Sequence, residues 1–265
     1  MRAPLLGWAI AVLVGCGRIG FDATGTGSGS SSPDGSTGSL QPDLRQLLPT
    51  EVANLVGYWR MDGDWRDASP RGNDLAIETG TPAFSSDSVV AQSGDLYDTS
   101  FQVSNRPSIE IAYLSYSAWF TSDPINTANS NSGQTVFKFS CATCGGDPDI
   151  DIAFTVQAGN DGTIYAGAVT LPPGTITANA WHHVAGVYAA TGERVYVDGV
   201  RVYTDPTARP PLQTTGGYLE IAQLWPNIGP LWNPQYLHGK MDELAIWSSA
   251  LDEASILAIY ANQHR

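Results

Sequence analysis

The chain has 265 residues, with 26 acidic and 13 basic side chains, a formal net charge of −13 and a pI near 4.4. This length suffices for one large all-β domain with a substantial core. The few, scattered Lys and Arg residues exclude a nucleic-acid-binding surface, because such affinity needs clustered basic side chains that neutralise phosphates. The carboxylates keep the chain soluble and offer oxygen ligands to hard cations.

The first 16 residues are predicted to be a lipoprotein signal peptide. Arg2 precedes an apolar run over residues 5–14, which is too short to cross a bilayer as a stable helix. Leu13-Val-Gly-Cys16 resembles a lipobox, which implies cleavage before Cys16 and acylation of its thiol. The resemblance implies a bacterial cell-envelope protein, at the outer membrane or cell surface, that meets the membrane only through its N-terminal lipid. An ordinary signal peptide with a chance cysteine is the alternative.

Residues 17–50 are predicted to form a flexible tether, and residues 51–265 the folded domain. Between Thr24 and Ser39 the sequence is almost entirely Gly, Ser and Thr, which cannot bury apolar surface. Residues 44–48 have the pattern of one brief helical turn ahead of the domain.

Within the domain, short apolar or alternating runs recur between Gly- and Pro-containing turns, which predicts antiparallel strands in a sandwich or barrel. The predicted strands cover residues 55–61, 116–121, 135–140, 150–157, 163–169, 181–188, 194–203, 217–222 and 237–247. Asp198-Gly199 supplies the positive φ angles of a tight hairpin. The strand patterns favour core positions for four tryptophans, namely Trp59, Trp119, Trp181 and Trp247.

Residues 250–262 are predicted to form a short helix that lies on the sandwich. Leu251, Ile256, Leu257 and Tyr260 have helical spacing after an acidic start at Asp252-Glu253.

Four sequence blocks together resemble the laminin-G-like, concanavalin A-like jelly-roll family over residues 54–262. They are Gly57-Tyr-Trp-Arg-Met-Asp62 with Asp67-Ala-Ser-Pro-Arg-Gly-Asn-Asp74, Ser117-Ala-Trp-Phe120, the hairpin that begins at Trp181, and Met241-Asp-Glu243. The resemblance implies a jelly-roll β-sandwich of two antiparallel sheets. It leaves function open, because lectins, adhesion modules and glycoside hydrolases share this architecture. Segments 123–149 and 205–236 match the family least, so specificity is expected there.

The same resemblance implies a structural Ca²⁺ held by Asp67 and Asp242. Asn73 is a possible carbonyl ligand, and Asp62 or Asp64 is in reserve. Ca²⁺ takes six to eight oxygen ligands, which carboxylates and turn carbonyls supply. The alternative is that Asp67 and Asn73 only shape their own turn through side-chain hydrogen bonds.

The run Asp147-Pro-Asp-Ile-Asp-Ile-Ala153 allows a weak hydrolase hypothesis. Laminarinase-type glycosidases resemble it by carrying Glu-x-Asp-x-Glu on one strand, and the matched positions here are Asp149, Asp151 and Ala153. Ala153 removes the acid/base that a retaining hydrolase needs. The alternatives are a polar strand face, or a groove in which Asp149 and Asp151 contact sugar without cutting it.

Aromatic side chains gather in a second candidate ligand site. Trp225, Trp232 and Tyr236 lie in a Pro-rich segment, where flat rings can stack on sugars or on a partner protein, or simply staple the loop.

The remaining cysteines and the histidine pair are assigned structural roles. Cys141 and Cys144 form an even pair in an exported chain, which favours a short disulfide over a redox or zinc site. His182 and His183 point to opposite sides of a strand and cannot converge on one ion.

These patterns predict a non-catalytic surface lipoprotein module that binds a glycan or a surface protein. The first alternative is a laminarinase-type glycoside hydrolase, degenerate in its carboxylates. The second is a structural envelope protein that contacts only other proteins.

Overall fold

The computed structural model describes residues 52–263 except 105–106, 125–132, 141–149, 158–160, 166–168, 172–173, 213–215 and 224–234. Side chains at residues 104, 140, 150–152, 157, 161–165 and 169–170 are also left outside the description. All described residues belong to one compact unit, Gln41–Arg265. The signal peptide with Cys16, the tether and the turn at 44–48 therefore lie outside the described residues. No helix in the described part is long and apolar enough to cross a membrane.

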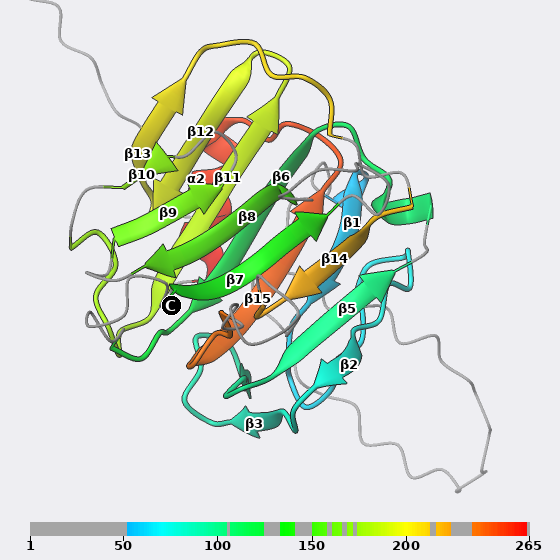
Figure 1. The fold of residues 1–265 in the computed structure, drawn as a ribbon, viewed down its shortest axis with the longest axis vertical. Coiled ribbons are helices and arrows are strands. Elements are labelled where there is room, and N and C mark those ends of the chain that lie inside the picture. The colour runs from blue at the N-terminus through cyan, green and yellow to red at the C-terminus, as the bar shows by residue number, and fades with distance from the viewer. Residues whose placement is uncertain are drawn as a thin grey trace, which may run out of the picture. The chain divides into compact units, whose positions relative to one another are not determined.

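Two antiparallel sheets form the domain (Figure 1). The first contains β1 (Leu55–Trp59), β3 (Ala83–Ser85), β4 (Ser93–Asp95), β6 (Leu114–Phe120), β11 (His182–Ala189), β12 (Gly192–Val197), β13 (Val200–Asp205) and β15 (Lys240–Trp247). The second contains β2 (Ala76–Thr79), β5 (Ser100–Ser104), β7 (Gly133–Ser140), β8 (Ile150–Gln157), β9 (Asp161–Tyr165), β10 (Val169–Thr170) and β14 (Tyr218–Ile221). A 3-10 helix, η1 (Pro107–Ile109), precedes β6.

The strand order is β13-β12-β11-β6-β15-β4-β3 in the first sheet, with β1 also paired to β15, and β10-β9-β8-β7-β14-β5-β2 in the second. Strand β15 pairs with β4 through Lys240 and Met241 and with β1 through residues 244–247. The register against β6 shifts between Asp242 and Ala245, where Glu243 has a φ of 54°. This bulge turns two consecutive acidic side chains out of regular alternation.

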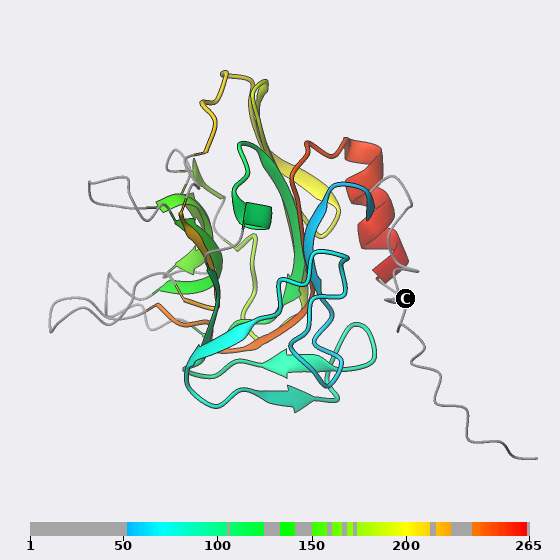
Figure 2. The same cartoon turned by 90° about the vertical axis from the view of Figure 1, so that its right-hand side faces the viewer.

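The core lies between the two sheets. Figure 2 shows both sheets edge-on, with their inner faces toward each other. Alternation along each strand sends every second side chain into the core. Phe120 of the first sheet meets Phe154 of the second edge to face, with ring centroids 5.7 Å apart. Val195 and Ile221 are buried in the same cluster.

Helix α2 (Glu253–Gln263) covers part of the outer face of the first sheet, as Figure 2 shows in red. Asp252 accepts a hydrogen bond of 2.8 Å from the Ser255 amide, which caps the helix. Ile256 and Ile259 are buried against the sheet, whereas Leu257 is 39% exposed. The prediction that Leu257 faces the sheet is therefore wrong. Ile256 and Ile259, three residues apart, form the buried side of the helix instead.

The structure confirms the two-sheet jelly roll, its short C-terminal helix and the Asp198-Gly199 hairpin, whose φ angles are 49° and 73°. The sequence patterns missed the short strands β2 to β5. Strands β3 and β4 have three residues each, which is too few to show alternation, whereas β5 does alternate, with Phe101 and Val103 buried. The placement of Trp181 in the core is also wrong, because it precedes β11 and is only half-buried.

Candidate functional site

A row of aromatic and charged side chains crosses the end of the first sheet where β4 ends and β15 begins. We call it the Tyr97–Trp181 strip, and its members are Asp87, Tyr97, Asp98, Trp181, His238 and Lys240. Lys240 pairs with Asp95 in the ladder, and the Leu96 amide donates to the Gly239 carbonyl at 3.0 Å. The pairing thus continues past β4 and brings Tyr97 opposite His238.

Tyr97 supplies an exposed aromatic surface. Its side chain is 59% exposed, and it is the one largely exposed aromatic among the residues that the structure describes. Its ring stacks on His238 with centroids 4.4 Å apart and an interplanar angle of 16°. His238 Nε2 lies 2.7 Å from Asp98 Oδ1. The histidine therefore holds the tyrosine ring from behind while itself being held by a carboxylate.

The backbone around His238 is tied to neighbouring strand ends. The His238 amide donates to Gln134 Oε1 at 2.9 Å, and the Asp123 amide donates to the His238 carbonyl at 2.7 Å. Gln134 Nε2 in turn donates to the Asp123 carbonyl at 2.9 Å. These bonds join the end of β6, the start of β7 and the approach to β15, so the aromatic stack rests on rigid elements.

Asp87 organises the other half of the strip. Its carboxylate accepts hydrogen bonds from Lys240 Nζ at 2.6 Å and from Trp181 Nε1 at 3.1 Å. The hydrogen bond from Lys240, followed by that from Trp181, lowers the pKa of Asp87. His238 and Lys240 are two residues apart in extended chain, so they share a face and connect the halves.

Tyr236 lies next to this strip, but the two predicted tryptophans are outside the described residues. Gln223 and Tyr236 form an isolated antiparallel bridge, and the Leu237 amide donates to the Ala222 carbonyl at 2.9 Å. The segment that carries Trp225 and Trp232 therefore leaves and rejoins the described chain beside His238. Trp225 and Trp232 as ligand contacts stay a prediction.

The predicted calcium ligands Asp67 and Asn73 lie together in a hydrogen-bonded turn. Asp67 Oδ1 accepts from the Tyr58 and Ser69 amides at 2.9 and 2.8 Å. Its Oδ2 accepts from Ser69 Oγ and the Asn73 amide, both at 2.7 Å. Burial raises the pKa of Asp67 against the effect of these bonds. A carboxylate has about four acceptor positions, and all four are used here, so Asp67 does not fit an ion.

Asn73 is equally occupied. Its carbonyl accepts from Trp59 Nε1 at 2.8 Å, its amide donates to the Val56 carbonyl at 2.7 Å, and Ser108 Oγ donates to its Oδ1 at 2.7 Å. It ties β1 to the segment before β6.

The third predicted ligand, Asp242, is fully buried on the β15 bulge. Its Oδ2 accepts from the Val89 and Val90 amides, both at 2.9 Å, whereas Oδ1 has no hydrogen-bond partner. Burial, followed by the neighbouring Glu243 carboxylate, raises the pKa of Asp242 to about 9. Asp62 acts on it electrostatically as well. Among the described residues no group of three or more His, Cys, Asp and Glu is placed to hold a metal ion.

The outer face of the second sheet bears on the hydrolase hypothesis. Ala153 is buried opposite Lys138, and Lys138 is opposite Glu220, with which it forms a buried ion pair. Burial raises the pKa of Glu220, and Lys138 opposes that rise. Asp149 is outside the described residues, and Asp151 lies in β8 without a described side chain. Ala153 thus sits where the pattern needs a carboxylate, and the carboxylate of Glu220, two strands away across Lys138, is already paired.

The two histidines of β11 diverge, as strand alternation predicts. His182 Nδ1 lies 2.8 Å from Asp198 Oδ2, and its Nε2 accepts from the Thr177 amide at 2.9 Å. His183 Nε2 lies 2.8 Å from Ser117 Oγ on the opposite face. This Ser–His pair is fully buried in the face that α2 covers, so it offers no accessible nucleophile.

The sequence reasoning missed most of the strip. The available signal was the alternation Asp95-x-Tyr97 and His238-x-Lys240, which places polar and aromatic side chains on one face. Neither stretch falls in the four blocks that carry the family resemblance, and Trp181 reads as a core residue because it begins an apolar strand pattern.

A family model described as the concanavalin A-like lectin/glucanases superfamily matches residues 94–257. The chain belongs to this concanavalin A-like superfamily. The match covers the two-sheet sandwich from β4 into α2, including Tyr97, Trp181, His238 and Lys240 of the strip. No curated protein sequence matches the chain.

Solved structures share the concanavalin A-like fold at low sequence identity. Domain 4 of the GH43 extracellular arabinanase AbnA from Geobacillus stearothermophilus, in complex with arabinotriose, has a TM-score of 0.60 and 19% identity, covering 78% of this chain and 98% of that domain. The binding domain of Paraclostridial Mosquitocidal Protein 1 has a TM-score of 0.57 and 15% identity, covering 79% of this chain and 52% of that chain. Trypanosoma rangeli sialidase has a TM-score of 0.57 and 12% identity, covering 80% of this chain and 33% of that chain. The chain thus spans about half of the second protein's chain and a third of the third's.

Proposed function

We propose that this concanavalin A-like domain is a non-catalytic carbohydrate-binding module whose ligand lies on the Tyr97–Trp181 strip. The observation that carries the proposal is the exposed Tyr97 ring, held flat against His238 beside charged hydrogen-bonding groups. An exposed aromatic ring that stacking and hydrogen bonds hold in place presents a preorganised flat face, which reduces the entropic cost of binding a ligand. The arabinotriose complex of AbnA domain 4 supports a sugar ligand by analogy of fold.

The strip combines the two kinds of contact that sugars need. Aromatic rings offer flat apolar faces to the C–H groups of a pyranose or furanose ring. Asp87, Asp98 and Lys240 keep exposed polar atoms beside those rings, with side chains that are 61%, 65% and 28% exposed. Acceptors and a donor are therefore available for sugar hydroxyls. Three carboxylates near one lysine, counting Asp95, favour a neutral over an acidic sugar.

Two features support a non-catalytic role. A retaining glycosidase needs two carboxyl groups about 5 Å apart, one of them protonated. On the described face of the second sheet, Ala153 occupies one matched position and Glu220 is paired with Lys138. In the strip, the carboxylate of Asp87 accepts from a lysine, and its lowered pKa disqualifies it as a general acid near neutral pH.

The test is a glycan array probed with the full chain, followed by calorimetry on the strongest neutral oligosaccharide, with arabino-oligosaccharides and β-glucans included. Tyr97→Ala is expected to weaken binding about 5- to 30-fold, corresponding to a loss of about 1–2 kcal/mol. Leu257→Ala, which also trims an exposed apolar side chain but on helix α2, over the outer face of the first sheet, is the matched control and is expected to bind normally.

Other outcomes separate the alternatives. Wild-type affinity in Tyr97→Ala would remove the strip as the site. Release of reducing sugar that is lost in Asp149→Asn would replace the binding module by the hydrolase. A blank array combined with saturable binding to a surface protein would support the protein-contact alternative.

Calcium remains part of the proposal, at Asp242 with Asp62 rather than at Asp67 and Asn73. The buried, unpartnered Oδ1 of Asp242 is the oxygen that an ion would use, and a bound Ca²⁺ would replace the proton that the raised pKa of Asp242 keeps on this carboxyl. Thermal unfolding of the wild type in Ca²⁺ and in chelator tests it. A rise in Tm with Ca²⁺ that Asp242→Asn abolishes is expected, and equal Tm values in both buffers would refute it.

The proposed location of the protein in the cell rests on its N-terminal sequence alone. We expect acylation of Cys16 to anchor the domain in the bacterial cell envelope, and Cys141 and Cys144 to form a disulfide there. Mass spectrometry of the mature protein would show a diacylglyceryl adduct that Cys16→Ser lacks. Thiol alkylation before and after reduction would report on Cys141 and Cys144, which lie outside the described residues.

A further inference from the structure

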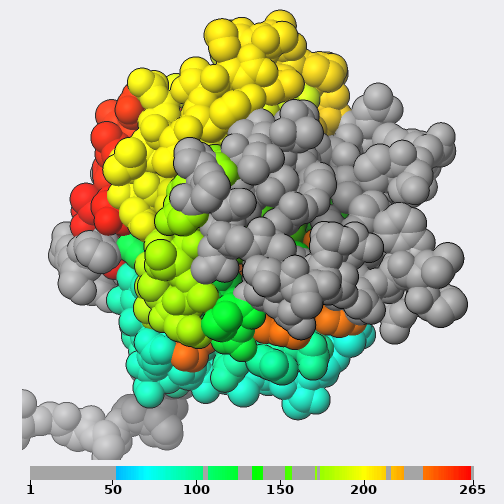
Figure 3. Space-filling model, turned by 60° about the vertical axis from the view of Figure 1, so that its left-hand side comes forward, coloured from blue at the N-terminus to red at the C-terminus, as the bar shows by residue number. Residues whose placement is uncertain are grey.

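Residues 86–92, which we call the 86–92 segment, connect β3 to β4 and carry Asp87 into the Tyr97–Trp181 strip. The segment contains no helix or strand, so the hydrogen bonds of the sheet ladder do not fix its position. In Figure 3 the teal atoms of the chain around β4 border the orange atoms of β15, and the yellow chain of β13 forms the other end of the molecule. The contacts that hold the segment at this end of the first sheet therefore decide where Asp87 lies.

Asp242 of β15 holds the middle of the segment. Its carboxylate is fully buried, and Oδ2 accepts hydrogen bonds of 2.9 Å from both the Val89 and the Val90 amides. Two amide donors on one oxygen set the direction of the chain as well as its distance from β15. Ala91, the next residue, has a φ of 49°, a conformation that costs free energy for a residue with a Cβ and persists only where neighbouring contacts impose it.

Three further hydrogen bonds fix the two ends of the segment. The Gln92 amide donates to Asp62 Oδ1 at 2.9 Å. The Asp87 amide donates to Ser85 Oγ at 3.1 Å, and Ser93 Oγ donates to the Asp87 carbonyl at 2.7 Å. The peptide groups on both sides of the Asp87 Cα are thus held, while its side chain is exposed at the surface.

Strand β15 contacts the segment at two points. Lys240 and Asp242 are two residues apart on the strand, so their side chains share a face. Lys240 Nζ donates to the Asp87 carboxylate, whereas Asp242 accepts from the backbone of the same segment. The Asp87 carboxylate also accepts from Trp181 Nε1. A shift of the segment away from Asp242 would therefore move the acceptor of both Lys240 and Trp181.

We propose that Asp242 is a positioning residue for the Tyr97–Trp181 strip, because it fixes the 86–92 segment and thereby the Asp87 carboxylate that orients Trp181. This inference rests on the proposed function, in which the strip holds a carbohydrate. It makes the affinity for that carbohydrate depend on a buried carboxylate that the sugar does not touch. A tryptophan that is oriented before binding lowers the entropic cost of association.

The other half of the strip does not depend on the segment. Tyr97 stacks on His238, whose Nε2 lies 2.7 Å from Asp98 Oδ1. These contacts involve no residue of the 86–92 segment. Loss of the Asp242 support is therefore expected to act on Trp181 and to leave Tyr97 in place.

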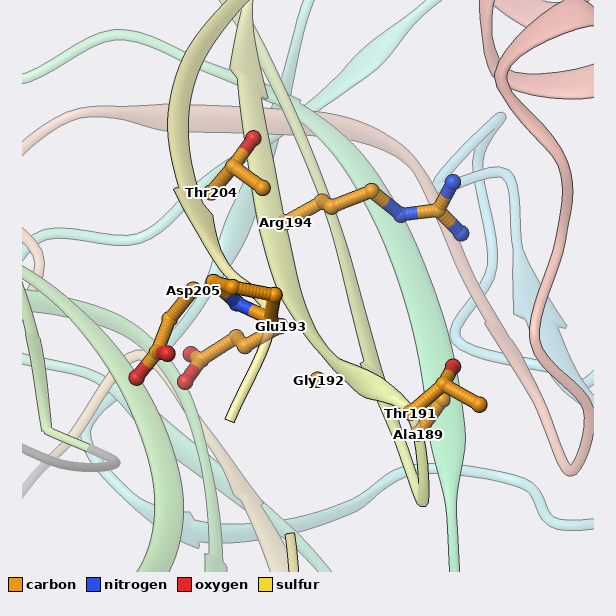
Figure 4. A pocket seen from close by; sticks show the side chains of 8 residues that line it. Ala189, Thr191, Gly192, Glu193, Arg194, Thr204 and Asp205 are labelled. Atoms are coloured by element: carbon orange, nitrogen blue, oxygen red, sulfur yellow. The ribbon is translucent and has the colours of Figure 1, made fainter. Parts of the chain in front are cut away.

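A second buried carboxylate of the first sheet serves as the matched control. Glu193 lies opposite Tyr188 of β11, at the far end of that strand from Trp181. Figure 4 shows Glu193 beside Asp205, and Arg209 Nη2 lies 3.0 Å from Glu193 Oε2 and 2.7 Å from Asp205 Oδ2. Glu193→Ala thus removes a buried carboxylate without touching the 86–92 segment.

The first test follows the indole N–H of Trp181 by nitrogen-edited proton NMR of the full chain in chelator, so that no metal ion contributes. The peak that Trp181→Phe lacks is the signal of this group. In Asp242→Ala it is expected to shift, and its exchange with water to accelerate at least about fivefold, because the N–H loses its fixed acceptor. Asp242→Asn keeps a carbonyl oxygen for the two amides, so it is expected to retain the wild-type peak, as is Glu193→Ala.

The second test is calorimetry with the neutral oligosaccharide that binds most strongly on the glycan array. Asp242→Ala and Asp87→Ala are each expected to weaken binding about 5- to 10-fold, and the double variant no further, because both act through one contact path. Asp242→Ala and Tyr97→Ala are expected to multiply their losses, because the two halves of the strip are independent. A merely structural role of Asp242 would lower Tm without this pattern.

An unmoved Trp181 peak in folded Asp242→Ala would overturn the inference, and so would multiplied losses when Asp242→Ala is combined with Asp87→Ala. Asp242→Leu, which fills the space without offering an acceptor, takes the place of Asp242→Ala if thermal unfolding shows that the latter does not fold. A blank array together with a displaced Trp181 peak would overturn the proposed function and still support the positioning of Trp181 by Asp242.

Discussion

Replacement of Glu193 by Gln is expected to remove a pH dependence from the stability of the domain. The carboxylate is 4% exposed, and burial raises its pKa from 4.5 to about 7. Between these values the folded state keeps a proton that the unfolded state has lost. The contribution of Glu193 to stability is therefore fully present below pH 4.5 and falls as the pH rises to 7.

The size of the effect follows from the shift. A change of 2.5 pKa units corresponds to about 3.4 kcal/mol. Arg209 and Asp205 are partly solvated, with side chains 17% and 25% exposed, and screening reduces the figure to about 2 kcal/mol. For a domain of this size that is about 4–8 °C in Tm.

Thermal and urea unfolding of wild type and Glu193→Gln at pH 4.5, 6 and 7.5 measures the difference directly. The wild type is expected to lose about 2 kcal/mol relative to the variant across this range. Other buried carboxylates titrate in both proteins, so they cancel in the comparison. A difference that stays constant with pH, or that grows in favour of the wild type at high pH, would refute the assignment of a raised pKa to Glu193.

Three further substitutions test the packing. Gly192→Ala is expected to lower the free energy of unfolding by at least about 2 kcal/mol, because the φ angle of Gly192 is 128° and the new Cβ would lie 2.2 Å from the Asp205 carbonyl oxygen. An unchanged Tm would contradict the close approach. Lys138→Met leaves Glu220 buried without a cation and is expected to lower the free energy of unfolding by about 3–5 kcal/mol. Adding Glu220→Leu is expected to recover most of this loss, and a double variant as unstable as the single variant would argue against the pairing. Asn73→Ala removes a buried and a partly buried side-chain hydrogen bond, and it is expected to lower the free energy of unfolding in urea by about 2 kcal/mol, with no change in calcium response. A lost calcium response would restore Asn73 as a ligand.

The long strands were predictable from the sequence because they are long runs rich in apolar residues between turn signals. Strand β8 alternates apolar and polar residues along its length, whereas β6, β11 and β15 are buried on both faces and read as nearly continuous apolar runs. The strands β3 and β4 have three residues each, which is too few for a period to be visible. Their positions depend on pairing with β15 and with each other, which is a long-range property.

The candidate site was predicted less well, for a related reason. The Tyr97–His238 stack joins residues that are 141 positions apart, and Asp87 receives hydrogen bonds from residues 94 and 153 positions away. Nothing local in the sequence marks Tyr97 as exposed, and a tryptophan before a strand reads the same whether it faces the core or solvent. Tyr236, which the aromatic pattern singles out, lies two residues from His238 of the strip, and its role in binding stays a prediction.

By itself, the sequence determined the fold class, the hairpin at Asp198-Gly199, the C-terminal helix and the divergence of His182 and His183. Each of these follows from local backbone preference or from a period that side chains show along one segment. Only the tertiary structure decided that the carboxylate of Asp67 accepts all its hydrogen bonds within its own turn and from β1. It also decided that Glu193 and Asp205 share the Arg209 guanidinium and that Tyr97 stacks on His238. Those outcomes depend on which residues distant in the chain come within a few ångströms, and hydrogen bonds and charges act only over such distances.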